Sequence, residues 1–329
     1  MATILAMQAQ ALPAKPPLAI GGSSTVYPIL QRAIKDYQAS GHQGGAPIRL
    51  SETGTTAGLR EFCNGRLAMA NASRPIQARE LKACASRGVS FVELPIAFDA
   101  ITVVVNGKND WAQMISTKEL SRLWSREAEG RIRRWSQVNN DWPDRPIKLC
   151  GPGADSGTYD YFNKAINGNE SNSRKDYDAS EDDLEIAKCV ASDRQALAYF
   201  GYGYYKANAA RLRSLAVVGR QGPVSPAVAT VQNGSYTPLS RPLFLYVNAG
   251  LLRTDPELRR FAAFVVANGM KLSESAGSIP LPPSTYRLVE TKLHKVVLGS
   301  SFAGDLPVGL TIGEALRRSF DAERRPEFR

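Results

Sequence analysis

The feature that most constrains this chain is the repeated alternation of a short apolar segment, a loop rich in Gly, Ser and Thr, and a helix. Apolar residues 18–20 precede loop 21–25 and a helix expected over 26–40, and residues 48–50 precede loop 52–58 and a helix from Leu59. Such units are typical of parallel α/β sheets, in which ligands bind at the carboxyl ends of the strands. The sequence therefore predicts an α/β fold with its binding loops at those ends.

The same pattern resumes after residue 106. Ser116 and Glu119 have the spacing of a capping box and predict a helix to Trp124. We also expect strands at 67–70, 90–94, 101–105, 147–150, 196–199 and 243–247, and helices at 77–86, 159–165, 182–191, 256–267 and 286–297. Residues 311–329 are expected to fray.

Two of these strands have similar sequences, ITVVVN at 101–106 and LFLYVN at 243–248. One leaves the first unit and the other re-enters it, so they could be paired crossings between two lobes. They could equally be ordinary core strands, and the sequence alone leaves both interpretations open.

Composition excludes several classes of protein. The 329 residues are enough for two domains, and no apolar run approaches the ~20 residues that span a bilayer. The net charge of +10 does not indicate nucleic-acid binding, because the densest basic stretch, 122–134, is interleaved with Glu127 and Glu129. Only two histidines, His42 and His294, are present, which excludes a histidine-rich metal site.

The N-terminus and the cysteines indicate the compartment. Ala9-Gln10-Ala11 fits the cleavage pattern of a secretory signal whose start is missing, although a floppy N-terminus explains the segment nearly as well. In an exported chain, an even number of cysteines favours disulfides. The four cysteines allow three connectivities, and we favour those that stay within one local βα region, Cys63–Cys84 and Cys150–Cys189. Buried free thiols in a cytosolic protein are the alternative.

Hydroxyl side chains gather where the expected helices begin. Three loops carry them, and their residues are Ser23, Ser24, Thr25, Thr55, Ser156, Gly157 and Thr158. Backbone N–H groups at a helix N-terminus favour an anion, and hydroxyls add donors. Any one of these loops could simply cap its own helix, but three at the same sheet edges indicate a cavity for a small tetrahedral anion. Arg74, at the end of a third strand, could supply a positive charge.

Enzyme signatures are missing from the sequence. It contains no phosphate-binding P-loop, no complete dinucleotide fingerprint and no G-x-S-x-G elbow. No nucleophile can be matched with a base, so we expect a binding protein without catalysis, metal or cofactor.

Several segments, taken in order, resemble the phosphate-binding proteins of the PstS/SphX kind, the solute receptors of ABC phosphate importers, and especially their cyanobacterial branch. The motifs that carry the resemblance are GGSSTVYP (21–28), ETGTTAGLREF (52–62), ANASRPI (70–76), GPGADSGTYDYF (151–162), YDASEDD (177–183) and ALAYFGYGYY (196–205). The resemblance covers roughly residues 17–290.

The resemblance implies a type II periplasmic-binding-protein fold, with two α/β lobes, two crossover strands and phosphate in the cleft. The first lobe would comprise 17–106 and 243–329, the second 107–242, and 1–16 would be export signal and linker. The implied phosphate-binding residues are Ser23, Ser24, Thr25, Thr55, Ser73, Arg74, Ser156, Gly157 and Thr158. It also implies a periplasmic monomer that meets the permease subunits of an ABC importer.

Two positions depart from the pattern of many relatives. They have an Asp, which accepts the proton of monohydrogen phosphate, where this chain has Arg74, and an Arg where it has Pro152. We therefore expect Arg74 to hold the anion and the site to accept sulfate more readily. Alternatively, Arg74 pairs with Asp155 or Asp160 across the cleft as a latch.

Three alternatives to a phosphate receptor remain. The protein could be a receptor for sulfate or another tetrahedral oxyanion. It could be a phosphatase-like hydrolase, which the missing nucleophile and base disfavour. An adhesion protein would be favoured only if the loops were too open to bind an ion.

Overall fold

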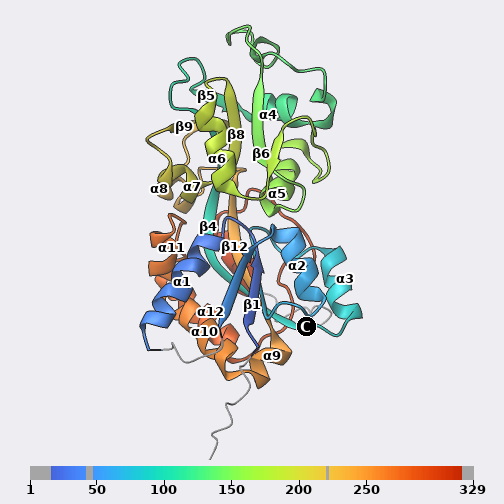
Figure 1. Cartoon of the computed structure of the whole chain (residues 1–329), viewed down its shortest axis with the longest axis vertical. Helices are drawn as coiled ribbons and strands as arrows, with labels where there is room; N and C mark the ends of the chain where they lie inside the picture. The colour runs from blue at the N-terminus through green and yellow to red at the C-terminus, as the bar shows by residue number, and fades with distance from the viewer. Residues whose placement is uncertain (1–15, 42–46, 220–221, 321–329) are drawn as a thin grey trace, which may run out of the picture.

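The computed structural model describes residues 16–41, 47–219 and 222–320. It has two α/β lobes stacked along the long axis, with strands β4 (Phe91–Asn106) and β12 (Ser240–Asn248) running between them (Figure 1). The Ala9-Gln10-Ala11 segment and residues 321–329 lie outside the described residues. In the part of the chain that is described, no helix has the length and apolar character needed to cross a membrane.

The first lobe, at the bottom of Figure 1, is built around three short parallel strands and the helices that cover them. These strands are β1 (Leu18–Gly22), β2 (Ile48–Glu52) and β3 (Met69–Ala72). The helices of this lobe are α1 (Tyr27–Ala39), α2 (Thr55–Cys63), α3 (Ala78–Ser86), α9 (Ala249–Thr254), α10 (Pro256–Ala267), α11 (Gly269–Ser275), α12 (Pro283–His294) and α13 (Ile312–Phe320).

The second lobe, at the top of Figure 1, is likewise built from strands with helices beside them. Its elements are β5 (Met114–Ser116), α4 (Thr117–Trp124), β6 (Lys148–Pro152), α5 (Gly157–Asn167), β7 (Asp178–Ser180), α6 (Asp183–Ser192), β8 (Ala196–Gly201), α7 (Tyr202–Ala207), β9 (Leu212–Ser214), β10 (Ala216–Gly219), β11 (Gly222–Val224) and α8 (Val228–Gln232), with short 3-10 turns at Arg126–Ala128 and Trp135–Gln137.

One sheet path joins the lobes, in the order β2-β1-β3-β12-β4-β8-β6-β7, with β9 beside β4. In this sheet β1 is parallel to β2 and β3, and β6 is parallel to β7 and β8, as predicted, whereas β12 is antiparallel to both β3 and β4, and β4 is antiparallel to β8 and β9. A separate small sheet has the order β11-β10-β5. The crossover strands β12 and β4 therefore connect the parallel strands of the first lobe to those of the second within one sheet.

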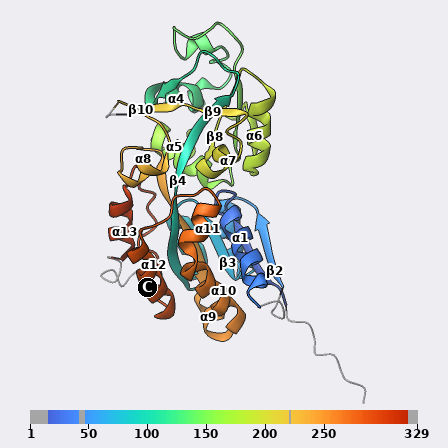
Figure 2. The same ribbon diagram turned by 90° about the vertical axis from the view of Figure 1, so that its left-hand side faces the viewer.

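Strand β4 corrects the prediction of two separate strands at 90–94 and 101–105. It is one strand of 16 residues, all buried (Figure 2). The predicted break between residues 94 and 101 does not occur, because β12 pairs with residues 91–100 and accommodates Pro95 at a register shift between Leu243 and Phe244. The similar segments 101–106 and 243–248 do not pair with each other: the first pairs mainly with β8, and the second with residues 91–97. The domain boundaries at 106/107 and 242/243 stay a prediction.

Most local predictions are confirmed, with small shifts. The capping box of α4 is present, with Glu119 N donating to Ser116 Oγ at 3.1 Å and Ser116 N donating to Glu119 Oε2 at 2.6 Å. Helix α2 begins at Thr55 rather than Leu59. The expectation that residues from 311 fray is wrong for 312–320, which form α13 with Ile312 and Ala315 buried.

Both favoured disulfides are confirmed. Cys63–Cys84 ties α2 to α3 with a Cα–Cα distance of 4.3 Å, and Cys150–Cys189 ties β6 to α6 at 6.3 Å. The alternative of four free thiols is therefore wrong.

Candidate functional site

The hydroxyl-rich loops of both lobes meet where the lobes face each other. Thr25 Oγ1, at the start of α1, lies 3.5 Å from Thr158 Oγ1 in α5 of the other lobe. Thr55 Oγ1 lies 3.3 Å from Ser73 Oγ, and a Cβ added to Gly157 would come within 2.5 Å and 2.7 Å of these two oxygens. The structure therefore brings together residues from all the loops that the sequence singled out.

These groups are removed from water but not fully paired. Ser23, Ser24, Ser73 and Ser156 are at most 3% exposed. The hydroxyl of Ser23 is buried, and among the residues that the structure describes it has no hydrogen-bond partner. Buried polar groups nearly always find partners, so an unmatched hydroxyl in such a cluster is typical of a site that receives a polar ligand.

The N-terminus of α5 supplies donors as well as a cap. Ser156 Oγ accepts from Thr158 N at 3.1 Å, so the capping interpretation of this loop is correct. Accepting that bond leaves the hydroxyl proton of Ser156 available to donate elsewhere. Capping and anion binding are therefore compatible here.

The positive charge among these hydroxyls comes from Arg241, in the crossover strand β12, which the sequence analysis missed. Its Nη2 donates to Thr25 Oγ1 at 3.1 Å and to Thr158 Oγ1 at 2.9 Å, so it contacts both lobes. The side chain is fully buried, and its Nη1 has no hydrogen-bond partner within residues 16–41, 47–219 and 222–320. This guanidinium can therefore offer two N–H groups to an anion.

Asp99, opposite Arg241 on β4, holds that guanidinium in place. Asp99 Oδ2 accepts from Arg241 Nε at 3.1 Å and from Nη2 at 2.9 Å, and Oδ1 accepts from Tyr202 N at 2.9 Å. The two residues are directly paired in the ladder between the crossover strands. A signal for this pair existed in the sequence, since Asp99 and Arg241 are charges within runs that are otherwise apolar, and buried charges require partners.

Arg74 lies elsewhere, in a separate network of carboxylates. It donates from Nε to Asp160 Oδ2 at 2.7 Å, from both terminal nitrogens to the two oxygens of Glu80, and to Thr56 Oγ1 and Pro75 O. These five bonds use all five N–H groups of the guanidinium. The geometry thus agrees with the alternative of a latch to Asp160, and it leaves Arg74 no donor for an anion.

Neighbouring carboxylates keep the Arg74 guanidinium charged despite its burial. Burial alone would lower the pKa of Arg74, but the charges and hydrogen bonds of Glu80 and Asp160 raise it above its ordinary value. Asp160 belongs to the second lobe, while Arg74 and Glu80 belong to the first. The network therefore holds the lobes together next to the hydroxyl cluster.

Further contacts close the gap between the lobes. Thr56 N donates to Asp155 O at 2.9 Å, Tyr204 Oη donates to Ser24 O at 3.2 Å, and Gln77 Nε2 donates to Glu170 Oε2 at 2.9 Å. The structure is thus a closed arrangement in which the loops of one lobe hydrogen-bond those of the other.

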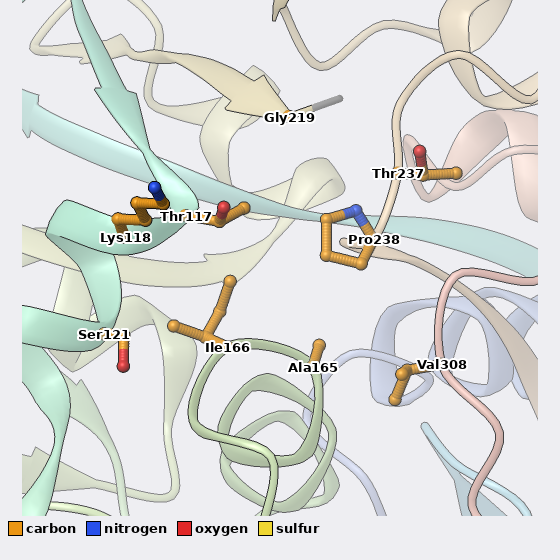
Figure 3. Close-up of a pocket in the computed structure, with 9 residues that line it drawn as sticks. All are labelled: Thr117, Lys118, Ser121, Ala165, Ile166, Gly219, Thr237, Pro238 and Val308. Atoms are coloured by element: carbon orange, nitrogen blue, oxygen red, sulfur yellow. The ribbon is translucent and has the colours of Figure 1, made fainter. Parts of the chain in front are cut away.

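A separate cavity lies apart from this cluster. It has a volume of about 690 Å³ (Figure 3) and shares no lining residue with the hydroxyl loops. Its lining residues are Thr117, Lys118, Ser121, Ala165, Ile166, Gly219, Thr237, Pro238 and Val308. Across the residues that the structure describes, no three His, Cys, Asp or Glu side chains are grouped to hold a metal ion. The chemistry of the cluster is that of an anion site built from hydroxyls, backbone N–H groups and one guanidinium.

Comparison with known proteins places the chain in a family. Residues 8–268 match the model of the PBP superfamily domain. SphX of Synechocystis is 45% identical over 306 residues, covering 93% of this chain and 90% of SphX. The chain belongs to the PstS/SphX family. The phosphate-binding protein PstS of Staphylococcus aureus is 33% identical over 268 residues, or 81% of this chain and 79% of PstS.

Solved structures of similar proteins agree with this assignment. The crystal structure of a possible phosphate-binding protein from Planctomyces limnophilus is 34% identical, with a TM-score of 0.63, and the match covers 86% of this chain and 99% of that one. An ABC-type phosphate transport receptor from Vibrio cholerae, at 21% identity and TM-score 0.60 over 80% of this chain and 99% of that one, shows the fold alone. The resemblance and the two-lobed periplasmic-binding-protein fold are therefore confirmed.

Proposed function

We propose that this chain binds inorganic phosphate between its lobes and delivers it to an ABC importer. Its relatives PstS, a phosphate-binding protein, and the possible phosphate-binding protein of Planctomyces limnophilus support phosphate as the ligand. The observation that carries the proposal is the unpartnered Nη1 of Arg241, a buried positive charge whose other nitrogens are fixed by Asp99, Thr25 and Thr158. A preorganised, dry set of donors suits a small anion with four oxygens.

The residues of the cluster contribute charge, hydrogen bonds and closure of the lobes. Arg241 supplies the full countercharge, in place of Arg74. The hydroxyls of Ser23, Ser24, Thr25, Thr55, Ser73, Ser156 and Thr158 and the backbone at Gly157 supply hydrogen bonds. Arg74 acts as the latch, because its bond to Asp160 forms only when the lobes meet. Hinge closure of this kind is how periplasmic binding proteins enclose a ligand.

We infer that the protein is an exported monomer that acts as a receptor, without catalysis, and docks on membrane permease subunits. The two disulfides support an oxidising compartment, since such bonds persist in the periplasm and are rare in the cytosol. Membership of the PstS/SphX family, the solute receptors of ABC phosphate importers, supports the importer as partner.

Calorimetric titration of refolded, phosphate-stripped protein tests the proposal. Inorganic phosphate should bind with one site per chain, and a parallel titration with sulfate measures the selectivity. Tighter binding of sulfate than of phosphate would make the protein a receptor for a different oxyanion. No heat with either anion, for a protein whose fold is intact by circular dichroism, would overturn the proposal.

A further inference from the structure

Carboxylates from both lobes face one another beside the anion site. We call Glu52, Glu181, Asp182 and Asp183 the acidic cluster. Glu52 ends β2 in the first lobe, whereas the other three lie between β7 and the first turn of α6 in the second. Glu181 Oε2 is 2.9 Å from the position that a Cβ on Gly54 of the first lobe would occupy, so the cluster forms only when the lobes are close.

Three oxygens of this cluster are buried without a hydrogen-bond partner in the described part of the chain. They are Glu52 Oε1, Glu181 Oε2 and Asp183 Oδ2. Asp183 itself is only 1% exposed. A buried carboxylate that lacks partners strongly favours its neutral form. Three such oxygens in one interface indicate that closure is incompatible with full ionisation of the cluster.

The groups that face the cluster do not compensate its charge. Asp183 faces Arg241 and the hydroxyl of Ser24 from the other elements, but also the negative charges of Asp99 and Glu52. Arg241 already forms an ion pair with Asp99 at 2.9 Å. A neutral phenol, Tyr204 of α7, completes this side of the cluster.

Glu181 is no better matched. It faces Asp155 and Asp160, and its one stabilising contact is the bond that its Oε1 accepts from Asp155 N at 3.1 Å. The cations next to these two aspartates are committed, since Arg60 pairs with Asp155 and Arg74 with Asp160. Glu52 faces the charge of Asp182. Closure therefore brings negative charges together, and the cations next to them among the described residues, Arg60, Arg74 and Arg241, are already paired.

We propose that closure of the lobes around phosphate takes up protons at the acidic cluster, so that the protein holds phosphate more tightly at mildly acidic than at alkaline pH. The inference rests on the proposed function and adds a regulation to it. An importer's receptor with this property would release its ligand more readily in an alkaline medium.

The direction of the effect follows from the pKa values in the closed form. Burial raises the pKa of Glu52 and of Glu181 to about 7 and that of Asp183 to about 8, each with a further rise from neighbouring acids. In an open, solvated cleft these groups have ordinary values near 4. Closure at pH 7 should therefore take up about two protons, and closure above about pH 9 almost none. Affinity should fall as the pH rises from about 5 to 8 and level off beyond.

Calorimetric titration with inorganic phosphate, in buffers of different ionisation enthalpy, counts these protons. The wild type is compared with a variant carrying Glu52→Gln, Glu181→Gln and Asp183→Asn, and with Glu127→Gln, an exposed carboxylate outside the cluster. Because phosphate's own protonation is common to all, it cancels in the difference. At pH 7 the wild type should take up about two protons more than the triple variant, and at pH 9.5 the difference should nearly vanish. Glu127→Gln should match the wild type.

The outcomes separate the two proposals. Binding at one site per chain with equal proton counts in wild type and triple variant would overturn this inference alone. Absence of phosphate binding in the wild type would overturn the proposed function and the inference with it. If the triple variant does not fold, Glu52→Gln alone serves, with about half a proton fewer expected at pH 7 and an unchanged count contradicting the inference.

Discussion

Replacing Arg241 should remove most of the phosphate affinity, and the structure gives the size of the loss. The free Nη1 carries two N–H groups, and a hydrogen bond to a charged group contributes roughly 1.5–3 kcal/mol. Two such bonds correspond to about 3–6 kcal/mol, or about two to four orders of magnitude in Kd. Arg241→Met alone would leave Asp99 buried without a countercharge and cost about 3–5 kcal/mol of folding free energy.

The informative variant therefore removes both charges, Asp99→Asn with Arg241→Met. Its melting temperature should stay closer to that of the wild type than does that of Arg241→Met alone, because no buried charge is left unpaired. Asp99→Asn by itself is the control, since it keeps the guanidinium, and its phosphate affinity should stay within about tenfold of wild type. Calorimetric titration measures Kd for each protein. An unchanged Kd in the folded double variant would refute the role given to Arg241.

Three further predictions concern closure and stability. Gly157→Ala should weaken phosphate binding at least about tenfold, because its Cβ would collide with two hydroxyls of the first lobe, whereas Gly313→Ala, with no atom within 4 Å, should bind normally. Arg74→Met should lower the free energy of unfolding by about 3–5 kcal/mol, because it leaves Glu80 and Asp160 without their cation. It should reduce the affinity for phosphate far less than the loss of Arg241 does. If a folded Arg74→Met variant does not bind phosphate, Arg74 is the partner of the anion after all. Replacing the disulfide between Cys63 and Cys84 by serines should cost about 3 kcal/mol in chemical denaturation while one phosphate still binds; unchanged stability would contradict this.

Local patterns in the sequence are enough to predict most of the fold. The capping box at Ser116, the hydroxyl loops and both cysteine pairs depend on residues close in the chain or on one repeated unit, and the structure confirms the box and the pairs. The convergence of the loops followed from the rule that parallel strands present their carboxyl ends at one edge. These predictions needed no knowledge of long-range partners.

The cation of the site could not be assigned from the sequence, because its partners are far away in the chain. Arg241 and Asp99 are 142 positions apart, and only the ladder between β4 and β12 places them opposite each other. Arg74 was the plausible choice by its position at a strand end. Its partner Asp160 is 86 positions away, so the competition for its donors became visible only in three dimensions.

The continuous strand β4 was missed for a related reason. Pro95 and Asp99 resemble a break when they are taken one at a time. Pairing with β12 accommodates the first at a register shift, and Arg241 neutralises the second. In both cases a tertiary partner overrides a local preference.

A crystal structure of the protein grown with phosphate tests the central claim most directly. We expect one phosphate between the lobes, with an oxygen within hydrogen-bond distance of Nη1 of Arg241 and others on the hydroxyl of Ser23 and the N-terminus of α5. Arg74 should remain on Glu80 and Asp160. A phosphate bound instead to Arg74, or lodged in the cavity lined by Lys118 and Val308 while Nη1 of Arg241 stays unpartnered, would contradict the account.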